Sequence, residues 1–154
     1  MNKHGPFFST RQAGKADCRY IKSLGCAVFD LYGPYGEILS SWFSSEITYT
    51  VVASTQEGMS GFAMLALTSG IAELLAIAVE PDMRGMGVGG FLMDEVIRRA
   101  RQGKVKYFML HTAVDNSAAQ GLFEKYGFVR SGIRDDFYPN GQDAFIMTRH
   151  IYDE

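Results

Sequence analysis

The sequence predicts one mixed α/β domain over residues 1–154, with helices on the faces of a single sheet. Apolar or β-branched runs bounded by turn residues predict strands, and longer segments with apolar residues at helical spacing lie between several of them. The chain shows no repeat and no linker, and 154 residues with 47% hydrophobic composition can bury a core without a metal or a disulfide. We expect the order β-α-α-β-β-β-α-β-α-β-β.

The N-terminal part of the chain predicts one strand and two helices. Residues 7–12 suit a strand. Residues 13–45 have a helical pattern that Gly33–Pro34 and Gly36 interrupt. Because glycine and proline end helices, we expect two short helices joined by a turn.

Three consecutive strands are predicted next. Turn residues at 56–58 and 68–70 separate three apolar or β-branched runs: 47–53, 61–67 and 72–79. The most apolar window, residues 61–79, contains polar residues and a turn, so we interpret it as two strands rather than as a membrane span.

A helix is predicted over residues 88–100, where apolar residues recur at helical spacing, and a strand over residues 107–113. A second helix over residues 116–126 is expected to end at Gly127. Its start has three candidate capping residues: Asp115, Asn116 and Ser117.

The chain closes with two predicted strands, over residues 128–137 and 144–151. Asn140–Gly141 lies between them, and an Asn-Gly pair between two strand-like runs is a strong hairpin signal.

Charge and cysteine content exclude several classes of protein. The net charge of −2 and the pI of about 5.9 favour neither a nucleic-acid partner nor a membrane surface. Cys18 and Cys26 lie eight residues apart in a helical segment, and no Cys/His cluster accompanies them, so we expect neither a disulfide nor a metal site. The N-terminus has no apolar signal-peptide region, and we expect a cytoplasmic protein.

Residues 76–90, "AIAVEPDMRGMGVGG", place many glycines between a predicted strand and a predicted helix. Unpaired N–H groups converge at a helix N-terminus, and missing β-carbons let a phosphate come close. The Walker pattern fails because the loop lacks the required Lys-Ser/Thr. Gly85, Gly87 and Gly90 satisfy the dinucleotide fingerprint, but five residues separate them from the strand and Tyr107 stands where an acidic residue is needed.

Arg84, Gly87 and Gly89 meet a third pattern, Arg-x-x-Gly-x-Gly. It resembles the pyrophosphate loop of the GNAT superfamily of acetyl-CoA-dependent N-acetyltransferases. Residues 72–100 resemble the strand-loop-helix of this superfamily throughout, and "NSAAQGLFEKYGFVRSG" at 116–132 resembles its second signature. The whole element order matches as well, so the resemblance covers nearly all of the chain from Phe8 onward.

The resemblance implies a sheet splayed between its fourth and fifth strands, with the pantetheine arm of acetyl-CoA in the gap. It implies direct attack of a primary amine on the acetyl group, with a backbone N–H at Ala78 or Val79 as the oxyanion donor. The cofactor-binding residues it implies are Ile77, Ala78, Val79, Arg84, Gly85, Met86, Gly87, Val88, Gly89, Asn116 and Phe123.

Two residues are candidates for the general base. Glu73 occupies the fourth strand, where the superfamily often places a glutamate acting through water. His111 lies in "LHTAVDNSAA", which resembles a strand of the protein N-terminal acetyltransferases whose histidine helps to deprotonate the substrate. An imidazole titrates at about 6.5 and an α-amine at about 7.7–8, which suits proton transfer near neutral pH.

The general acid departs from the superfamily pattern. Phe123 stands where a tyrosine usually precedes the Glu-Lys-x-Gly-Phe string, and a phenyl ring cannot donate a proton. Tyr126 follows three residues later on the same helix face and is a candidate substitute, or packs under the helix end. A thiolate also leaves fairly well unaided, because a thiol pKa is only about 8.5.

The acceptor is suggested by residues 135–151, "DDFYPNGQDAFIMTRHI", which resemble the ending of enzymes that acetylate protein N-termini. In that role Tyr138 lines the peptide groove, whereas Asp135 and Asp136 are expected to be solvated. Aromatic residues of the predicted second helix and the turn before it either line a pocket or belong to the core, and their helical spacing favours the core: Tyr32, Tyr35, Trp42 and Phe43.

We therefore expect an N-acetyltransferase that acts on the α-amine of a peptide or protein. A small-molecule amine acetyltransferase is an alternative on the same fold, and Phe123 also permits a sensor that binds acyl-CoA without turnover. A dinucleotide-binding protein is a more distant alternative. A homodimer is compatible with the resemblance, although no segment identifies an interface.

Overall fold

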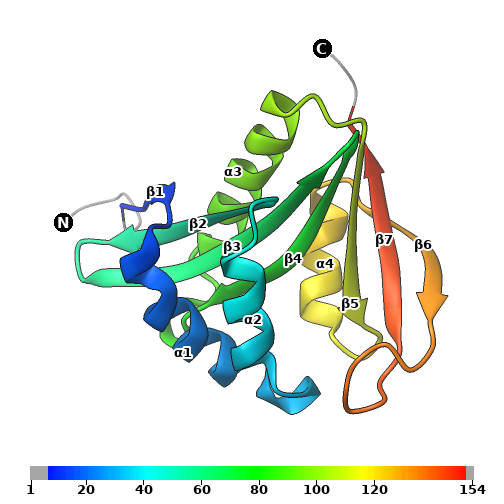
Figure 1. Ribbon diagram of the computed structural model, residues 1–154, viewed down its shortest axis with the longest axis horizontal. Coiled ribbons are helices and arrows are strands. Elements are labelled where there is room, and N and C mark those ends of the chain that lie inside the picture. The colour runs from blue at the N-terminus through cyan, green and yellow to red at the C-terminus, as the bar shows by residue number, and fades with distance from the viewer. Residues whose placement is uncertain (1–6, 152–154) are drawn as a thin grey trace.

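The computed structural model describes residues 7–151 and has the predicted order of strands and helices (Figure 1). Three short 3-10 helices are additional: η1 (Lys15–Asp17), η2 (Asp30–Tyr32) and η3 (Pro81–Met83). The main elements are β1 (Ser9–Gln12), α1 (Cys18–Phe29), α2 (Tyr35–Phe43), β2 (Thr48–Thr55), β3 (Gly58–Thr68), β4 (Ile71–Val79), α3 (Val88–Gln102), β5 (Tyr107–Ala113), α4 (Ser117–Lys125), β6 (Val129–Arg134) and β7 (Ala144–His150).

The seven strands form one sheet in the order β1-β2-β3-β4-β5-β7-β6. All neighbouring strands are antiparallel except β4 and β5, which are parallel. Helices α1 and α2 cover one face of the first half of the sheet, and α3 and α4 cover the other face (Figure 1). Among residues 7–151, no helix has the length and apolar character needed to cross a membrane.

The sheet splays between β4 and β5, as predicted. The two strands pair from Ile71 opposite Tyr107 to Leu74 opposite Leu110 and no further. Both strands continue beyond this point, β4 to Val79 and β5 to Ala113, so they leave a fork with unpaired backbone edges. This fork is the feature of the fold that positions the site.

A β-bulge lies in β4 where the fork opens. Leu65 of β3 pairs with Leu74 and Met64 pairs with Ala76, which leaves Leu75 as the extra residue. Leu74 packs in the core beneath α3, whereas Leu75 and Ala76 both pack with the cluster beneath α1 and α2. The bulge therefore turns two successive side chains of β4 toward the α2 side of the sheet.

The last hairpin differs from the prediction. Strand β6 ends at Arg134 rather than near residue 137, so the connecting loop spans residues 135–143 instead of the predicted 138–143. Asn140 explains the difference, because its backbone N–H donates to the Tyr32 carbonyl at 3.0 Å and its side-chain amide donates to the Leu31 carbonyl at 3.1 Å. These bonds hold the loop against η2. The first strand is also shorter than predicted and begins at Ser9.

Candidate active site

The glycine-rich loop forms the N-terminus of α3. Gly85 and Gly87 have φ values of +77° and +93°, in the left-handed region that favours glycine, and a β-carbon at either position would meet no atom within 4 Å. Their lack of side chains therefore serves backbone conformation and leaves open space in front of the helix. The first N–H groups of α3 face an opening where an anionic group fits.

A groove of about 930 Å³ runs along this loop and the splayed end of β4. Arg84 and Lys125 are its cationic lining residues, and Lys125 was not anticipated from the sequence. The groove is lined by nearly all of the residues predicted to bind the cofactor: Ile77, Ala78, Val79, Arg84, Gly85, Gly87, Val88, Gly89, Asn116 and Phe123. Met86 is the exception, because it does not line the groove and its side chain is exposed.

Asn116 is the residue that caps α4, which settles the choice among the three candidates. Its side-chain oxygen accepts a hydrogen bond from the N–H of Ala119 at 3.2 Å. The helix ends before Gly127, whose φ of +84° supplies the predicted left-handed stop. The cap fixes Asn116 at the mouth of the fork, where it lines the groove.

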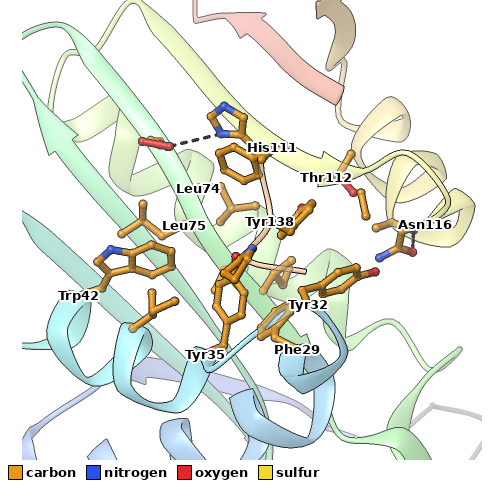
Figure 2. A pocket seen from close by; sticks show the side chains of 18 of the residues that line it. Phe29, Tyr32, Tyr35, Trp42, Leu74, Leu75, His111, Thr112, Asn116 and Tyr138 are labelled. Atoms are coloured by element: carbon orange, nitrogen blue, oxygen red, sulfur yellow. Dashed lines mark hydrogen bonds and ion pairs between the residues drawn. The ribbon is translucent and has the colours of Figure 1, made fainter. Parts of the chain in front are cut away.

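A second cavity of about 330 Å³ lies on the α2 side of the fork and is shown in Figure 2. One end of this cavity joins the groove along the glycine-rich loop, which we refer to as the cofactor groove. The residues that line both are Phe29, Tyr32, Ile77, Asn116, Ala119 and Phe123. Two open spaces that meet at unpaired strand edges can hold two reactants with their reacting ends together. We refer to the second cavity as the acceptor pocket.

His111 and Glu73, the two candidate bases, meet in the acceptor pocket. Nδ1 of His111 lies 3.6 Å from a carboxylate oxygen of Glu73, a distance for a charge contact rather than a hydrogen bond (dashed in Figure 2). The His111 side chain is only 9% exposed, and its Nε2 atom is buried without a hydrogen-bond partner. Buried polar atoms normally have partners, so an unpartnered buried imidazole nitrogen is unusual and marks His111 as a candidate functional residue.

Phe137 holds the plane of the His111 ring. The two rings are stacked, with centroids 4.3 Å apart and an interplanar angle of 11°. Phe137 comes from the loop between β6 and β7 and lines the same pocket. No local pattern indicated this contact, because Phe137 was expected at the end of the strand over residues 128–137.

Phe123 and Tyr126 occupy different places on α4 and at its end. Phe123 is buried and lies at the junction of the two cavities. Tyr126 lines only the cofactor groove, where its hydroxyl donates to the Gly90 carbonyl at 2.9 Å. Burial raises the pKa of Tyr126, so its phenol stays protonated at neutral pH.

Tyr138 lines the acceptor pocket, and its ring centroid lies 4.7 Å from that of Tyr32. Burial is the main cause that raises the pKa of Tyr138. Tyr32 is buried, and Tyr35 and Trp42 pack against the core cluster beneath α1 and α2, but all three also line the acceptor pocket. A helical spacing shows which residues share a face but not whether that face meets a core or a cavity. Asp135 and Asp136 are exposed, as expected.

Comparison with known proteins identifies the family. The sequence matches the Acetyltransferase (GNAT) family over residues 18–128. The chain belongs to the GNAT family. This membership makes the chain an acetyl-CoA-dependent acyltransferase and sets the dinucleotide alternative aside. The open space at Gly85 and Gly87, at the N-terminus of α3, is compatible in size and polarity with the pyrophosphate of acetyl-CoA.

Relatives within the GNAT family include enzymes named ribosomal protein bS18-alanine N-acetyltransferase. The Escherichia coli K12 enzyme is 35% identical over 101 residues, which cover 63% of this chain and 68% of that protein. The Salmonella typhimurium enzyme is 33% identical over 101 residues, covering 64% and 68%. The crystal structure of the E. coli enzyme has a TM-score of 0.82 with 25% identity and covers 96% of both chains. The chain thus fits the branch of GNAT enzymes that acetylate protein N-termini.

Proposed function

We propose that this GNAT enzyme transfers the acetyl group of acetyl-CoA to the α-amine of a peptide or protein N-terminus, with His111 as general base. The bacterial relatives named for acetylation of a ribosomal-protein alanine support an α-amine acceptor. A small-molecule amine is the second candidate, because the mostly apolar, aromatic lining of the acceptor pocket does not require the acceptor to be a peptide.

The observation that carries this proposal is the buried, unpartnered Nε2 atom of His111 in a pocket that opens into the cofactor groove. An amine reaches the pocket mostly as an ammonium ion, and it must lose a proton before it can attack. In this proposal Nε2 accepts that proton. The carboxylate of Glu73 near Nδ1 then stabilises the imidazolium that forms.

The cofactor side supplies the electrophile, which is the thioester of acetyl-CoA. In this proposal the N–H of Ala78 or Val79, at the end of β4 that does not pair with β5, donates to the thioester oxygen as it gains negative charge. The N-terminus of α3, together with Arg84 and Lys125, binds the pyrophosphate and other phosphate groups. These contacts hold the reacting carbon at the junction of the two cavities.

The departing thiolate needs a proton in the end, but the protein offers no acid at the usual position because Phe123 occupies it. Tyr126 keeps its proton at neutral pH and lines the cofactor groove, which makes it the candidate donor. Its hydroxyl is directed to the Gly90 carbonyl, so donation requires that this hydrogen bond be exchanged. Solvent can protonate the thiolate instead.

The test is to incubate the purified protein with acetyl-CoA, peptides with free N-termini and small amines, and to detect products by mass spectrometry. Acetylated peptide α-amines are the expected products. If only the small amines are acetylated, the proposal of a peptide acceptor is wrong, whereas the proposal of acetyl transfer stands. Binding of acetyl-CoA without any product would instead favour the non-catalytic sensor that Phe123 permits.

An acceptor such as a ribosomal protein is made in the cytoplasm, and we propose that location for the enzyme.

A further inference from the structure

We propose that the acceptor pocket selects a primary amine whose neighbouring carbon carries a large apolar group, preferably aromatic, and no free carboxylate. The inference rests on the proposed acetyl transfer and names the class of acceptor. On a peptide, such an amine belongs to an N-terminal phenylalanine, tryptophan or methionine. As a small molecule, it belongs to an arylalkylamine such as 2-phenylethylamine. Both sources share the chemistry that the pocket recognises.

The pocket has an apolar end that lies away from the cofactor groove. Three residues of α2, Tyr35, Ile38 and Trp42, line this end together with Leu75 of β4, and none of them lines the groove. Figure 2 shows Trp42 and Leu75 at one end of the pocket and Asn116, which lines both cavities, at the other. A group attached to the reacting amine therefore has an apolar space to fill that the thioester does not need.

The bulge in β4 contributes to this end of the pocket. Because Leu75 is the extra residue, its side chain faces α2 together with the small Ala76 instead of entering the opposite core. Both residues line the pocket. Leu75 and Trp42 thus both line the apolar end of the pocket, and the small side chain of Ala76 leaves room beside Leu75.

The loop between β6 and β7 covers one side of the pocket. Tyr138 lies with its ring centroid 4.7 Å from that of Tyr32 and 6.5 Å from that of Tyr35. Pro139 approaches Gly33 so closely that a β-carbon on Gly33 would lie 2.6 Å from the proline ring. This loop is therefore packed against η2 and the residue that follows it, and aromatic rings bound the pocket on several sides.

The size and lining of the pocket argue against a small first side chain. A methyl group, as on alanine, leaves most of the roughly 330 Å³ without apolar contact. An aromatic side chain can fill the space between Trp42, Tyr35 and Leu75 and gains both apolar burial and ring contacts. One methylene group more or fewer on a substrate that binds in an apolar pocket changes kcat/KM by about 10-fold to 200-fold.

The charges argue against a free amino acid. Among the residues that the structure describes, none that lines the acceptor pocket is lysine or arginine, and Glu73 is its one carboxylate. A carboxylate beside the acceptor amine would be desolvated near Glu73 without a cationic partner other than the base itself. An amide, as in a peptide, or a simple amine carries no such charge.

The test measures kcat/KM with acetyl-CoA for peptides that differ only in the first residue, which is alanine, methionine, phenylalanine or tryptophan. Free phenylalanine, phenylalanine amide and 2-phenylethylamine complete the set. We expect the phenylalanine or tryptophan peptide to exceed the alanine peptide by about tenfold or more. We expect turnover of phenylalanine amide and at most one-tenth of that rate for free phenylalanine. A higher kcat/KM for 2-phenylethylamine than for the phenylalanine peptide identifies the small amine as the source, and the reverse identifies the peptide.

An alanine peptide that equals or exceeds the aromatic peptides would overturn the inference and leave the proposed acetyl transfer intact. Absence of product from every acceptor would overturn the proposed function itself. The two failures are therefore distinguishable.

Two variants link the selectivity to the pocket. Leu75→Phe fills the apolar end and should lower the ratio of kcat/KM for the phenylalanine peptide to kcat/KM for the alanine peptide by about tenfold or more. Ile71→Phe is the matched control, because Ile71 lies on the same strand, is 40% exposed and lines neither cavity. Trp42→Leu enlarges the same end and should shift the preference from phenylalanine toward tryptophan. Unchanged selectivity in both Leu75→Phe and Trp42→Leu contradicts the inference.

Discussion

His111 and Glu73 come from the two strands that diverge at the fork, and their side chains meet on the same face of the sheet, with 3.6 Å between Nδ1 and a carboxylate oxygen. The last paired residues of the two strands are Leu74 and Leu110, so His111 follows directly after the pairing ends. The parallel register thus brings the two candidate bases together in the acceptor pocket. Both act as one unit in the proposed mechanism.

Replacement of His111 by alanine should lower kcat/KM by about 10²-fold to 10⁴-fold, the usual contribution of a general base. The loss should be largest below about pH 8, where most of an α-amine is protonated and must be deprotonated by the enzyme. A pH–rate profile of His111→Ala compared with the wild type is the measurement. His150→Ala is the matched control, because this second histidine lines neither cavity. A profile that runs parallel to the wild type at all pH values removes His111 from the mechanism.

Glu73→Gln should lower kcat by about tenfold with little change in KM. The neutral amide keeps the shape of the side chain but no longer stabilises a protonated His111. Glu73→Asp, which retains the charge, should recover part of the rate, whereas a role that depends only on side-chain shape would favour Glu73→Gln. An unchanged kcat in Glu73→Gln, or a Glu73→Asp enzyme slower than Glu73→Gln, would contradict the pairing.

Gly87→Asp should weaken coenzyme A binding by about 100-fold or more, measured by isothermal titration calorimetry. The substitution adds negative charge beside the expected pyrophosphate and a β-carbon at a φ of +93°. Gly70→Asp controls for backbone strain, because Gly70 also has a positive φ of +75° and open space but lies in the β3–β4 turn outside the groove. Equal affinities in Gly87→Asp and wild type are incompatible with a pyrophosphate site at this loop.

Phe123→Tyr should raise kcat by about tenfold. Phe123 lies at the junction of the two cavities, so a hydroxyl added to its ring is placed near the departing thiolate. The gain should be largest for the chemical step, measured by single-turnover kinetics at saturating acetyl-CoA. A fall in kcat with unchanged stability would show that this position does not reach the thiolate.

Asp17→Asn should lower the free energy of unfolding at pH 7 by about 1 kcal/mol. Asp17 is buried, accepts two hydrogen bonds from Arg11 at 2.8 and 2.9 Å, and accepts one from the Gly14 N–H at 2.8 Å. The Arg11 contact lowers the pKa of Asp17, so its stabilisation is present above about pH 4 and is lost as the pH falls through the folded-state pKa. Urea unfolding of both proteins at pH 7 and pH 3 should show the difference shrinking at the lower pH. A difference independent of pH rules out a contribution from the charge.

The sequence allowed the element order, the glycine loop and the helix caps to be predicted, because each depends on local residues. Gly127 adopts the left-handed conformation expected at a helix stop, and Asn116, one of three candidates, caps α4. His111 and Glu73 were both candidates from the sequence, but their contact depends on the register between β4 and β5. No local pattern encodes that register.

The acceptor pocket was the part least accessible to sequence analysis. The bulge at Leu75 lies in an uninterrupted apolar run, where nothing marks the extra residue. Phe137 and Tyr138 reach the pocket because Asn140 anchors their loop to η2, a contact between residues more than 100 positions apart. Trp42 was assigned to the core for a related reason, since its helix face could not reveal that the splayed sheet leaves a cavity opposite.

The central claim is that this GNAT enzyme acetylates an α-amine with His111 as its base. The most direct test is to treat one peptide, which carries both a free N-terminus and an internal lysine, with acetyl-CoA and the wild-type enzyme or His111→Ala, and to locate the acetyl group by fragment-ion mass spectrometry. The account predicts acetylation of the N-terminal amine by the wild type and a loss of about 10²-fold or more in the variant at pH 7. Acetylation confined to the lysine, or an N-terminal rate that the variant retains in full, would contradict it.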